Sequence, residues 1–139
     1  MKSNSLVPEL SITNFEKTID FYTRILGFKI EYQRAEEGFA YLSLGEAQLM
    51  VDQIGKTRTW RTGDFEYPLG RGINLQISVG GGFESLLSLL RLNQIPLFME
   101  PEEKWYRKED YEVGNKQFLV QDPDGYLLRF FIDLGERKP

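Results

Sequence analysis

The sequence predicts an α+β fold made of two βαβββ units, and three observations support this prediction. The first is an order of elements (strand, helix and three strands) that occurs in residues 5–53 and again in residues 72–133. The second is an apolar stripe at helical spacing in each half. The third is a tight-turn signal followed by an alternating strand near the C-terminal end. A helix is expected to back each sheet, and the free faces to curve into cupped mixed sheets.

The first unit opens with residues 7–12, where apolar and polar side chains alternate as in a half-buried strand. Asn14 is suited to cap a helix and Gly27 to end it, and apolar residues recur at helical spacing between them. Three short strands, separated by turn-like stretches, are predicted after the helix. They are at residues 28–34, 39–44 and 47–53.

A connecting loop is predicted at residues 54–71, which carry charged residues, Gly and Pro without a clear period. The second unit then begins with residues 73–79, whose clean alternation predicts a strand. A helix with an apolar stripe starts at Phe83, and a further strand is predicted at residues 95–99. Residues 100–114 are charged and irregular, which favours a loop.

The last two strands are predicted at residues 117–121 and 126–132, on either side of an Asp-Pro-Asp-Gly sequence at residues 122–125. Pro presets φ, the short acidic side chains bond their own backbone, and Gly accepts a positive φ, so a tight turn is expected. In the final strand one face is apolar, while the opposite face carries Arg129. The whole chain, residues 1–139, is expected to form a single domain.

Composition argues against several classes of function. The 139 residues include no Cys and no His, so the chain has no thiol nucleophile, no imidazole base and no Cys/His zinc site. A net charge of −4 argues against general nucleic-acid binding, because phosphate affinity depends on clustered Lys and Arg. No stretch approaches the ~20 apolar residues that span a bilayer, and the beginning of the sequence lacks a secretory signal. We therefore expect a cytoplasmic protein without a nucleic-acid or membrane partner.

The sheet faces that point away from the helices are predicted to be polar on several strands. Strand parity places acidic, amide and aromatic side chains there, in a chain with enough apolar residues to avoid them. This pattern favours a lined, partly wet cavity; a face that is merely exposed to solvent, as antiparallel sheets allow, is the alternative. The residues concerned are Glu9, Ser11, Gln48, Met50, Asp52, Asn74, Gln76, Arg129 and Phe131, with Phe39, Tyr41 and Ser43.

Two segments of the chain carry a resemblance to a known family. NFEKTIDFYTRILGFKI is similar to the first helix and following strand of the vicinal oxygen chelate superfamily, and DPDGYLLRFF is similar to its last hairpin. This superfamily includes glyoxalase I, extradiol dioxygenases, fosfomycin-modifying enzymes and the bleomycin resistance proteins. Together with the repeated βαβββ order, the resemblance covers almost the whole chain.

The resemblance implies, for the enzymes of this family, a divalent metal held by His or Glu at four strand positions. Matching the motifs places these positions at Val7, Met50, Asn74 and Arg129. Val has no donor atom, a thioether suits soft metals, an amide is a weak ligand, and a guanidinium repels a cation. No metal and no cofactor are therefore expected. Arg129 is expected either to pair with Glu9 or Asp52, or to brace the sheet as a packed side chain.

The branch without metal ligands is similar to the bleomycin resistance proteins, homodimers that exchange strands and sequester a drug without altering it. The stretches GRGINLQISV and EPEEKWYRKEDYEVGNKQFLVQDPDG resemble this branch. The resemblance implies a homodimer that binds a bleomycin-like glycopeptide or another cationic aromatic antibiotic, through aromatic and acidic side chains. The predicted ligand-binding residues are Glu9, Phe39, Tyr41, Met50, Asp52, Trp60, Trp105, Tyr106 and Arg129; no residue is predicted to be catalytic.

Two other functions stay open at this point. One is a metal-independent enzyme with the same fold, in which Glu9 or Tyr41 acts as acid or base on an unknown small molecule. The other is an interaction module whose cup no longer binds a ligand. Trp60 and Trp105 both lie in predicted loops, where binding residues gather, but a Trp in a loop also often fills a local core.

Overall fold

The computed structural model describes residues 1–139, which form two compact units. The first unit comprises Met1–Leu69 and Pro123–Gly125, and the second comprises Gly70–Asp122 and Tyr126–Pro139. Each unit has a four-stranded mixed sheet and one α-helix. The predicted α+β fold of two βαβββ units is therefore confirmed, while their union in a single domain stays a prediction.

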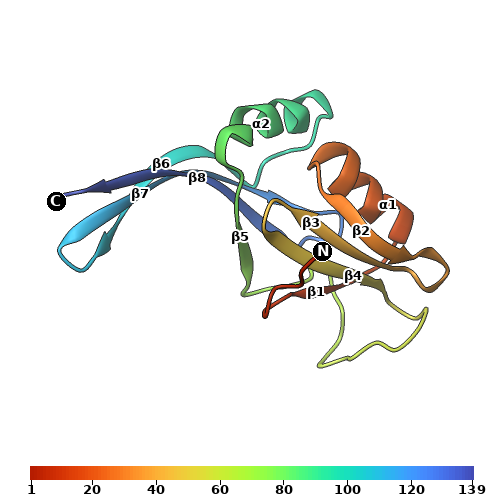
Figure 1. The fold of residues 1–139 in the computed structure, drawn as a ribbon. Coiled ribbons are helices and arrows are strands. Elements are labelled where there is room, and N and C mark those ends of the chain that lie inside the picture. The colour runs from red at the N-terminus through yellow and green to blue at the C-terminus, as the bar shows by residue number, and fades with distance from the viewer. The chain divides into compact units, whose positions relative to one another are not determined.

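In the first unit, one helix covers one face of the sheet, as Figure 1 shows. The strand order is β1-β4-β3-β2, with β1 parallel to β4 and the other neighbours antiparallel. The covered face is apolar: Leu10, Ile12, Leu49 and Val51 are all buried. The elements are β1 (Glu9–Ile12), α1 (Phe15–Asp20), β2 (Lys29–Arg34), β3 (Phe39–Leu44) and β4 (Ala47–Gln53).

The helical segment that starts with α1 begins and ends at the predicted residues, although its second half is a π-helix. The Asn14 side chain accepts a hydrogen bond from the Lys17 backbone N–H at 3.0 Å, as an N-cap does. After Asp20 the chain continues as a π-helical turn, Phe21–Ile25, and Gly27 ends the segment with a φ of +84°. The predictions for Asn14 and Gly27 are confirmed.

Strand β2 contains a bulge that the sequence pattern did not predict. Ile30 pairs with Leu42 on the face toward α1, whereas Tyr32 pairs with Tyr41 on the opposite face. Without the bulge, the two residues of β2 would share one face, because strand side chains alternate with a period of two. The bulge therefore places Tyr32 and Arg34 on the face away from α1.

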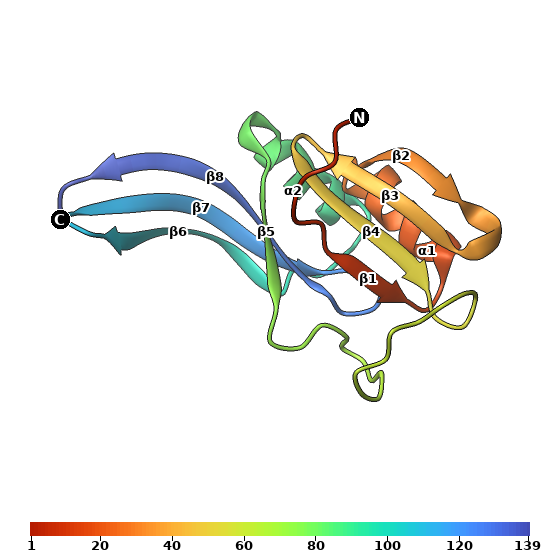
Figure 2. The same ribbon diagram turned by 60° about the horizontal axis from the view of Figure 1, so that its bottom comes forward.

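The second unit repeats this arrangement with longer strands. Its order is β5-β8-β7-β6, with β5 parallel to β8, and α2 lies beside the sheet (Figure 2). In its core the ring of Phe118 on β7 meets Phe83 on α2 edge to face and lies tilted against Phe130 on β8. The elements are β5 (Asn74–Ser78), α2 (Phe83–Leu92), β6 (Met99–Lys108), β7 (Tyr111–Gln121) and β8 (Leu127–Arg137).

The predictions for residues 95–99 and 100–114 are wrong. Strand β6 begins only at Met99. Residues 100–114, predicted to be a loop, form much of a long hairpin in which β6 pairs with β7 from Met99–Leu119 to Lys108–Tyr111. Charged residues have low intrinsic strand propensity, but pairing along the β6–β7 and β7–β8 ladders overrides that preference. Trp105 and Tyr106 therefore lie on a strand and not in a loop.

Strand β8 extends well beyond its neighbour β5. Strand β5 pairs with residues 127–131 of β8 only, while β7 pairs with β8 as far as Arg137. Residues 132–137 consequently have an open edge on the β5 side, where Figures 1 and 2 show β6, β7 and β8 continuing past β5. Such an edge offers unpaired backbone groups to another strand.

The predicted turn at residues 122–125 is confirmed and is fixed by its acidic side chains. Asp122 accepts a hydrogen bond from the Tyr126 backbone N–H at 3.0 Å. Asp124 is buried and accepts two bonds from Thr13, from the backbone N–H at 3.1 Å and from the hydroxyl at 2.6 Å. The turn therefore packs against the residue that follows β1.

No helix in the protein combines the length and apolar character needed to cross a bilayer.

Candidate functional site

The face of the first sheet away from α1 brings together five of the predicted binding residues. Glu9 pairs with Met50, and Met50 pairs with Tyr41, so these three form one row across β1, β4 and β3. Asp52 pairs with Phe39 in the next row. Cross-strand partners lie on the same face of a sheet, so two carboxylates, a thioether and two aromatic rings share this surface.

Neither of the two carboxylates on this face forms an ion pair, although the charge of Arg34 acts to lower the pKa of each. One carboxylate oxygen of Asp52 (Oδ1) is buried without a hydrogen-bond partner. Burial raises the pKa of Asp52, an effect that Arg34 partly opposes. Burial, and then the charge of Asp52, also raise the pKa of Glu9. The pair is thus a partly desolvated concentration of negative charge, which favours a cationic group.

Aromatic side chains surround these acids on β3 and β2. Tyr41 and Phe39 are buried, and the ring of Tyr32 stacks on Tyr41 with centroids 5.4 Å apart. The Arg34 guanidinium lies 4.1 Å from the centroid of the Phe39 ring. Sequence reasoning missed Tyr32 and Arg34, because only the bulge in β2 brings them to this face.

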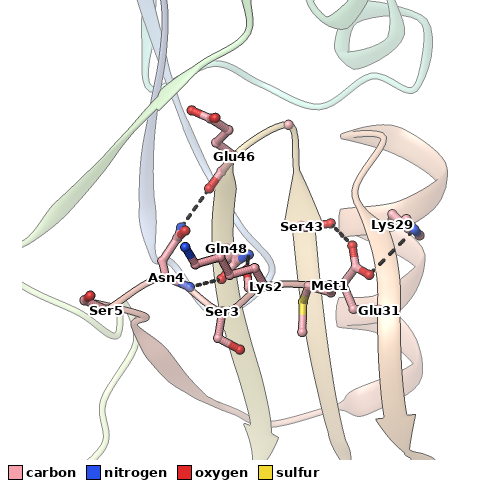
Figure 3. Close-up of a pocket in the computed structure, with 11 residues that line it drawn as sticks. Met1, Lys2, Ser3, Asn4, Ser5, Lys29, Glu31, Ser43, Glu46 and Gln48 are labelled. Atoms are coloured by element: carbon pink, nitrogen blue, oxygen red, sulfur yellow. Dashed lines mark hydrogen bonds and ion pairs between the residues drawn. The ribbon is translucent and has the colours of Figure 1, made fainter.

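An open hollow of about 820 Å³ lies at the other end of the same face, where the N-terminal segment runs beside β4 (Figure 3). Gln48 is its central contact: its Oε1 accepts bonds from the Tyr41 hydroxyl at 2.7 Å and the Asn4 N–H at 2.8 Å. Ser43 donates to Glu31 at 2.6 Å, and this bond, ahead of the charge of Lys29, holds the pKa of Glu31 below its usual value. These polar groups are satisfied within the protein, in contrast to Asp52.

In the second unit, Tyr106 and Arg129 line one hollow of about 430 Å³ together with Gln76 and Phe131. Trp105 does not belong to it, because adjacent strand residues point to opposite faces. The Trp105 ring instead covers Gly114, where a Cβ atom would lie 2.6 Å from the ring. The Arg137 guanidinium lies over the Trp105 ring, 4.0 Å from its centroid. Trp105 therefore packs within the hairpin sheet.

Trp60 is on none of the strands that carry the acids of the first unit. It sits in the loop between β4 and β5, is 66% exposed, and has the Arg58 guanidinium 5.1 Å from its ring. This exposed loop position leaves a ligand contact by Trp60 as a prediction.

The four positions matched to family metal ligands do not fit a divalent ion. Val7 precedes β1, and the residue that pairs with Met50 is Glu9; in the second sheet Arg129 pairs with Gln76 and not with Asn74. Whether Val7 or Glu9 is taken in the first sheet, and Asn74 or Gln76 in the second, each sheet supplies at most one carboxylate at these positions. The thioether, amide and guanidinium groups beside it are poor ligands for hard and borderline cations. The protein contains no group of three or more acidic, His or Cys side chains placed to hold a metal ion.

Comparison with known proteins gives a consistent picture. The model of the Glyoxalase/Bleomycin resistance protein/Dioxygenase superfamily matches residues 6–130. Bleomycin resistance proteins from Geobacillus stearothermophilus and Staphylococcus aureus are 26% identical over 133 residues, covering 90% of this chain and 93% of theirs.

Solved structures show a similar fold at low sequence identity. TioX from Micromonospora sp. ML1 has a TM-score of 0.72 at 20% identity, covering 95% of this chain and 100% of that chain. A virulence protein from Salmonella typhimurium has a TM-score of 0.68 at 17% identity, covering 95% of this chain and 98% of that one. At these identities the likeness supports the fold alone.

Proposed function

Since the chain belongs to the Glyoxalase/Bleomycin resistance protein/Dioxygenase superfamily, we propose that it is a non-catalytic protein that sequesters a cationic aromatic small molecule. A bleomycin-like glycopeptide antibiotic is the first candidate, because the distant relatives at 26% identity are bleomycin resistance proteins. The superfamily also contains enzymes, so membership by itself does not decide between binding and catalysis.

The observation that carries this proposal is the buried, unpartnered carboxylate oxygen of Asp52. A buried acceptor without a partner is costly, and a ligand cation that contacts it removes that cost. Glu9 adds a second negative charge on the same face, and the exposed ring of Tyr32, which stacks on the buried Tyr41, offers a surface for a flat group. A charged hydrogen bond of about 1.5–3 kcal/mol and a cation–ring contact of about 0.5–2 kcal/mol are together sufficient for useful affinity.

A titration with metal-free bleomycin, followed by calorimetry and then mass spectrometry of the drug, tests the proposal. Saturable binding with recovery of unchanged drug is expected. Recovery of a modified drug would favour the alternative, a metal-independent enzyme. Absence of any heat of binding at millimolar drug, for a protein that is folded by circular dichroism, would exclude bleomycin as the ligand.

Lowering the pH is expected to weaken the binding of a cationic ligand. The loss is expected to begin above the pH at which ordinary carboxyl groups take up protons. The pKa values of Glu9 and Asp52 are raised, so both groups take up protons above the ordinary carboxyl range near about pH 4. The folded protein then binds protons more tightly than the unfolded chain, so its stability rises as pH falls through the raised pKa values, while affinity falls. Calorimetric titrations between about pH 7 and pH 4 measure this; an affinity that stays constant over this whole interval would contradict it.

We further propose that the protein forms a homodimer through the open edge of β8 at residues 132–137. This edge has unpaired backbone groups, and a large apolar side chain of the same segment, Leu134, is 36% exposed. Light scattering during size-exclusion chromatography is expected to give twice the mass of the chain. A single species with the mass of one chain, at the concentrations used for ligand titration, would contradict a dimer.

A further inference from the structure

Arg129 in the second unit is a half-buried cation that forms no ion pair in the protein. Its Nε–H is buried and has no hydrogen-bond acceptor in the protein. Its neighbours in the sheet are Gln76 on β5 and Leu119 on β7, neither of which is acidic. The ion pairs of this unit, Arg91–Glu100, Lys116–Glu84 and Arg137–Glu112, do not include Arg129. A buried guanidinium donor left unpaired is expensive and usually has a functional explanation.

A second unsatisfied polar atom lies on the same face, one row away. Gln117 is 3% exposed and pairs with Phe131, the next residue but one after Arg129 on β8. Its amide nitrogen donates to the Tyr106 hydroxyl at 2.7 Å, while its oxygen, Oε1, is buried without a donor. The hydrogen bond holds the Gln117 amide beside Tyr106, which lines the hollow with Arg129. The hollow is therefore lined by Arg129, which has an unpaired donor, while the unpaired acceptor of Gln117 lies on the same sheet face and outside the lining.

The shape of the hollow suits a small, partly flat molecule. Its volume is about 430 Å³, within the range of small-ligand sites. Phe131 and Tyr106 provide aromatic walls, and Gln76 provides an amide next to Arg129. The charged residues that complete the lining are Lys108, Asp133 and Glu136, and all three are exposed to solvent. The half-buried Arg129 is thus the charge in the inner part of the hollow.

We propose that this hollow is a carboxylate site, in which the Arg129 guanidinium binds the carboxylate of a small planar acid and Phe131 and Tyr106 contact its flat body. Arg is suited to this task because its planar donors match a carboxylate in two parallel hydrogen bonds. The proposal is independent of the cationic ligand proposed for the face that carries Asp52.

Benzoate is a suitable probe, with benzamide as an uncharged molecule of nearly the same shape. We expect NMR titration of the full chain to shift the Arg129 Nε–H resonance on adding benzoate, with a Kd of about 1 mM for so small a molecule. Arg129→Gln is expected to weaken benzoate binding about tenfold or more. Arg129→Lys is expected to keep part of the affinity, since Lys keeps the charge but cannot form two parallel hydrogen bonds with one carboxylate. Arg91→Gln, the same change at an exposed helix position, is expected to have no effect.

Equal binding of benzamide, or unchanged benzoate binding by folded Arg129→Gln, would overturn the proposal. Asp52→Asn separates this site from the cationic one: it is expected to weaken bleomycin binding and leave benzoate binding unchanged. A change in benzoate affinity in Asp52→Asn would show that the two sites are not independent and would contradict the proposal as stated. Failure of bleomycin to bind, with benzoate binding intact, would reject only the proposed function.

Discussion

Replacing Asp52 by Asn is expected to weaken the binding of bleomycin about 30-fold, which corresponds to roughly 2 kcal/mol for one charged hydrogen bond. The same change is expected to raise the melting temperature of the free protein by roughly 2–4 °C. Both effects have one cause: the Asp52 carboxylate is partly desolvated and one of its oxygens has no partner, so its charge costs stability until a cation arrives. Calorimetry measures the first effect and thermal unfolding the second.

The matched control is Asp20→Asn, which removes a carboxylate from α1 on the opposite side of the same sheet. Asp20 is exposed and pairs with Arg24 at 2.8 Å, an arrangement in which ion pairs contribute little to stability. This variant is expected to keep the affinity of the wild type. A loss of stability in Asp52→Asn with unchanged ligand affinity would show that Asp52 is a structural residue, and the proposed function would lose its main support.

Replacing Asp124 by Ala is expected to reduce the free energy of unfolding by about 3 kcal/mol. Asp124 is 4% exposed and accepts bonds from the backbone N–H and the hydroxyl of Thr13, at 3.1 and 2.6 Å. Ala removes the buried carboxylate and both of these bonds, and the turn at residues 122–125 loses its anchor to the end of β1. Urea unfolding followed by fluorescence measures the change.

Asp124→Asn is the informative companion, because it keeps one side-chain acceptor and the size of the residue. A loss smaller than that of Asp124→Ala is expected, since a neutral acceptor forms a weaker bond than a carboxylate. If Asp124→Ala changes stability by less than about 1 kcal/mol, water replaces the carboxylate without cost, and the turn does not depend on this anchor.

Much of the fold was predictable, because local patterns and burial agree in most of the chain. The apolar stripe of α1 between Asn14 and Gly27, the strands β3 and β4 and the turn before β8 were all predicted from periodicity and turn chemistry. The family resemblance, which rested on two motifs, is confirmed by the match over residues 6–130. The charged hairpin was not predicted, because its strands depend on pairing with each other and with β8, which no local pattern records.

The candidate site was only partly predictable for the same reason. Alternation along β1, β3 and β4 correctly placed Glu9, Tyr41 and Asp52 on one face. The addition of Tyr32 required a bulge in β2, whose position depends on the partner strand. The ligand contacts of all these residues, and of Trp60 and Trp105, stay predictions.

The sequence by itself determined the repeated order of elements, the apolar and polar faces of most strands, and the lack of imidazole and thiol chemistry. These properties follow from residue type and a fixed side-chain period. Tertiary structure alone decided which polar groups find partners. Gln48 and Asp124 are satisfied by residues far away in the sequence, while the carboxylate of Asp52 and the guanidinium of Arg129 are not. Hydrogen bonding and desolvation depend on distances between strands, and these exist only once the chain has folded.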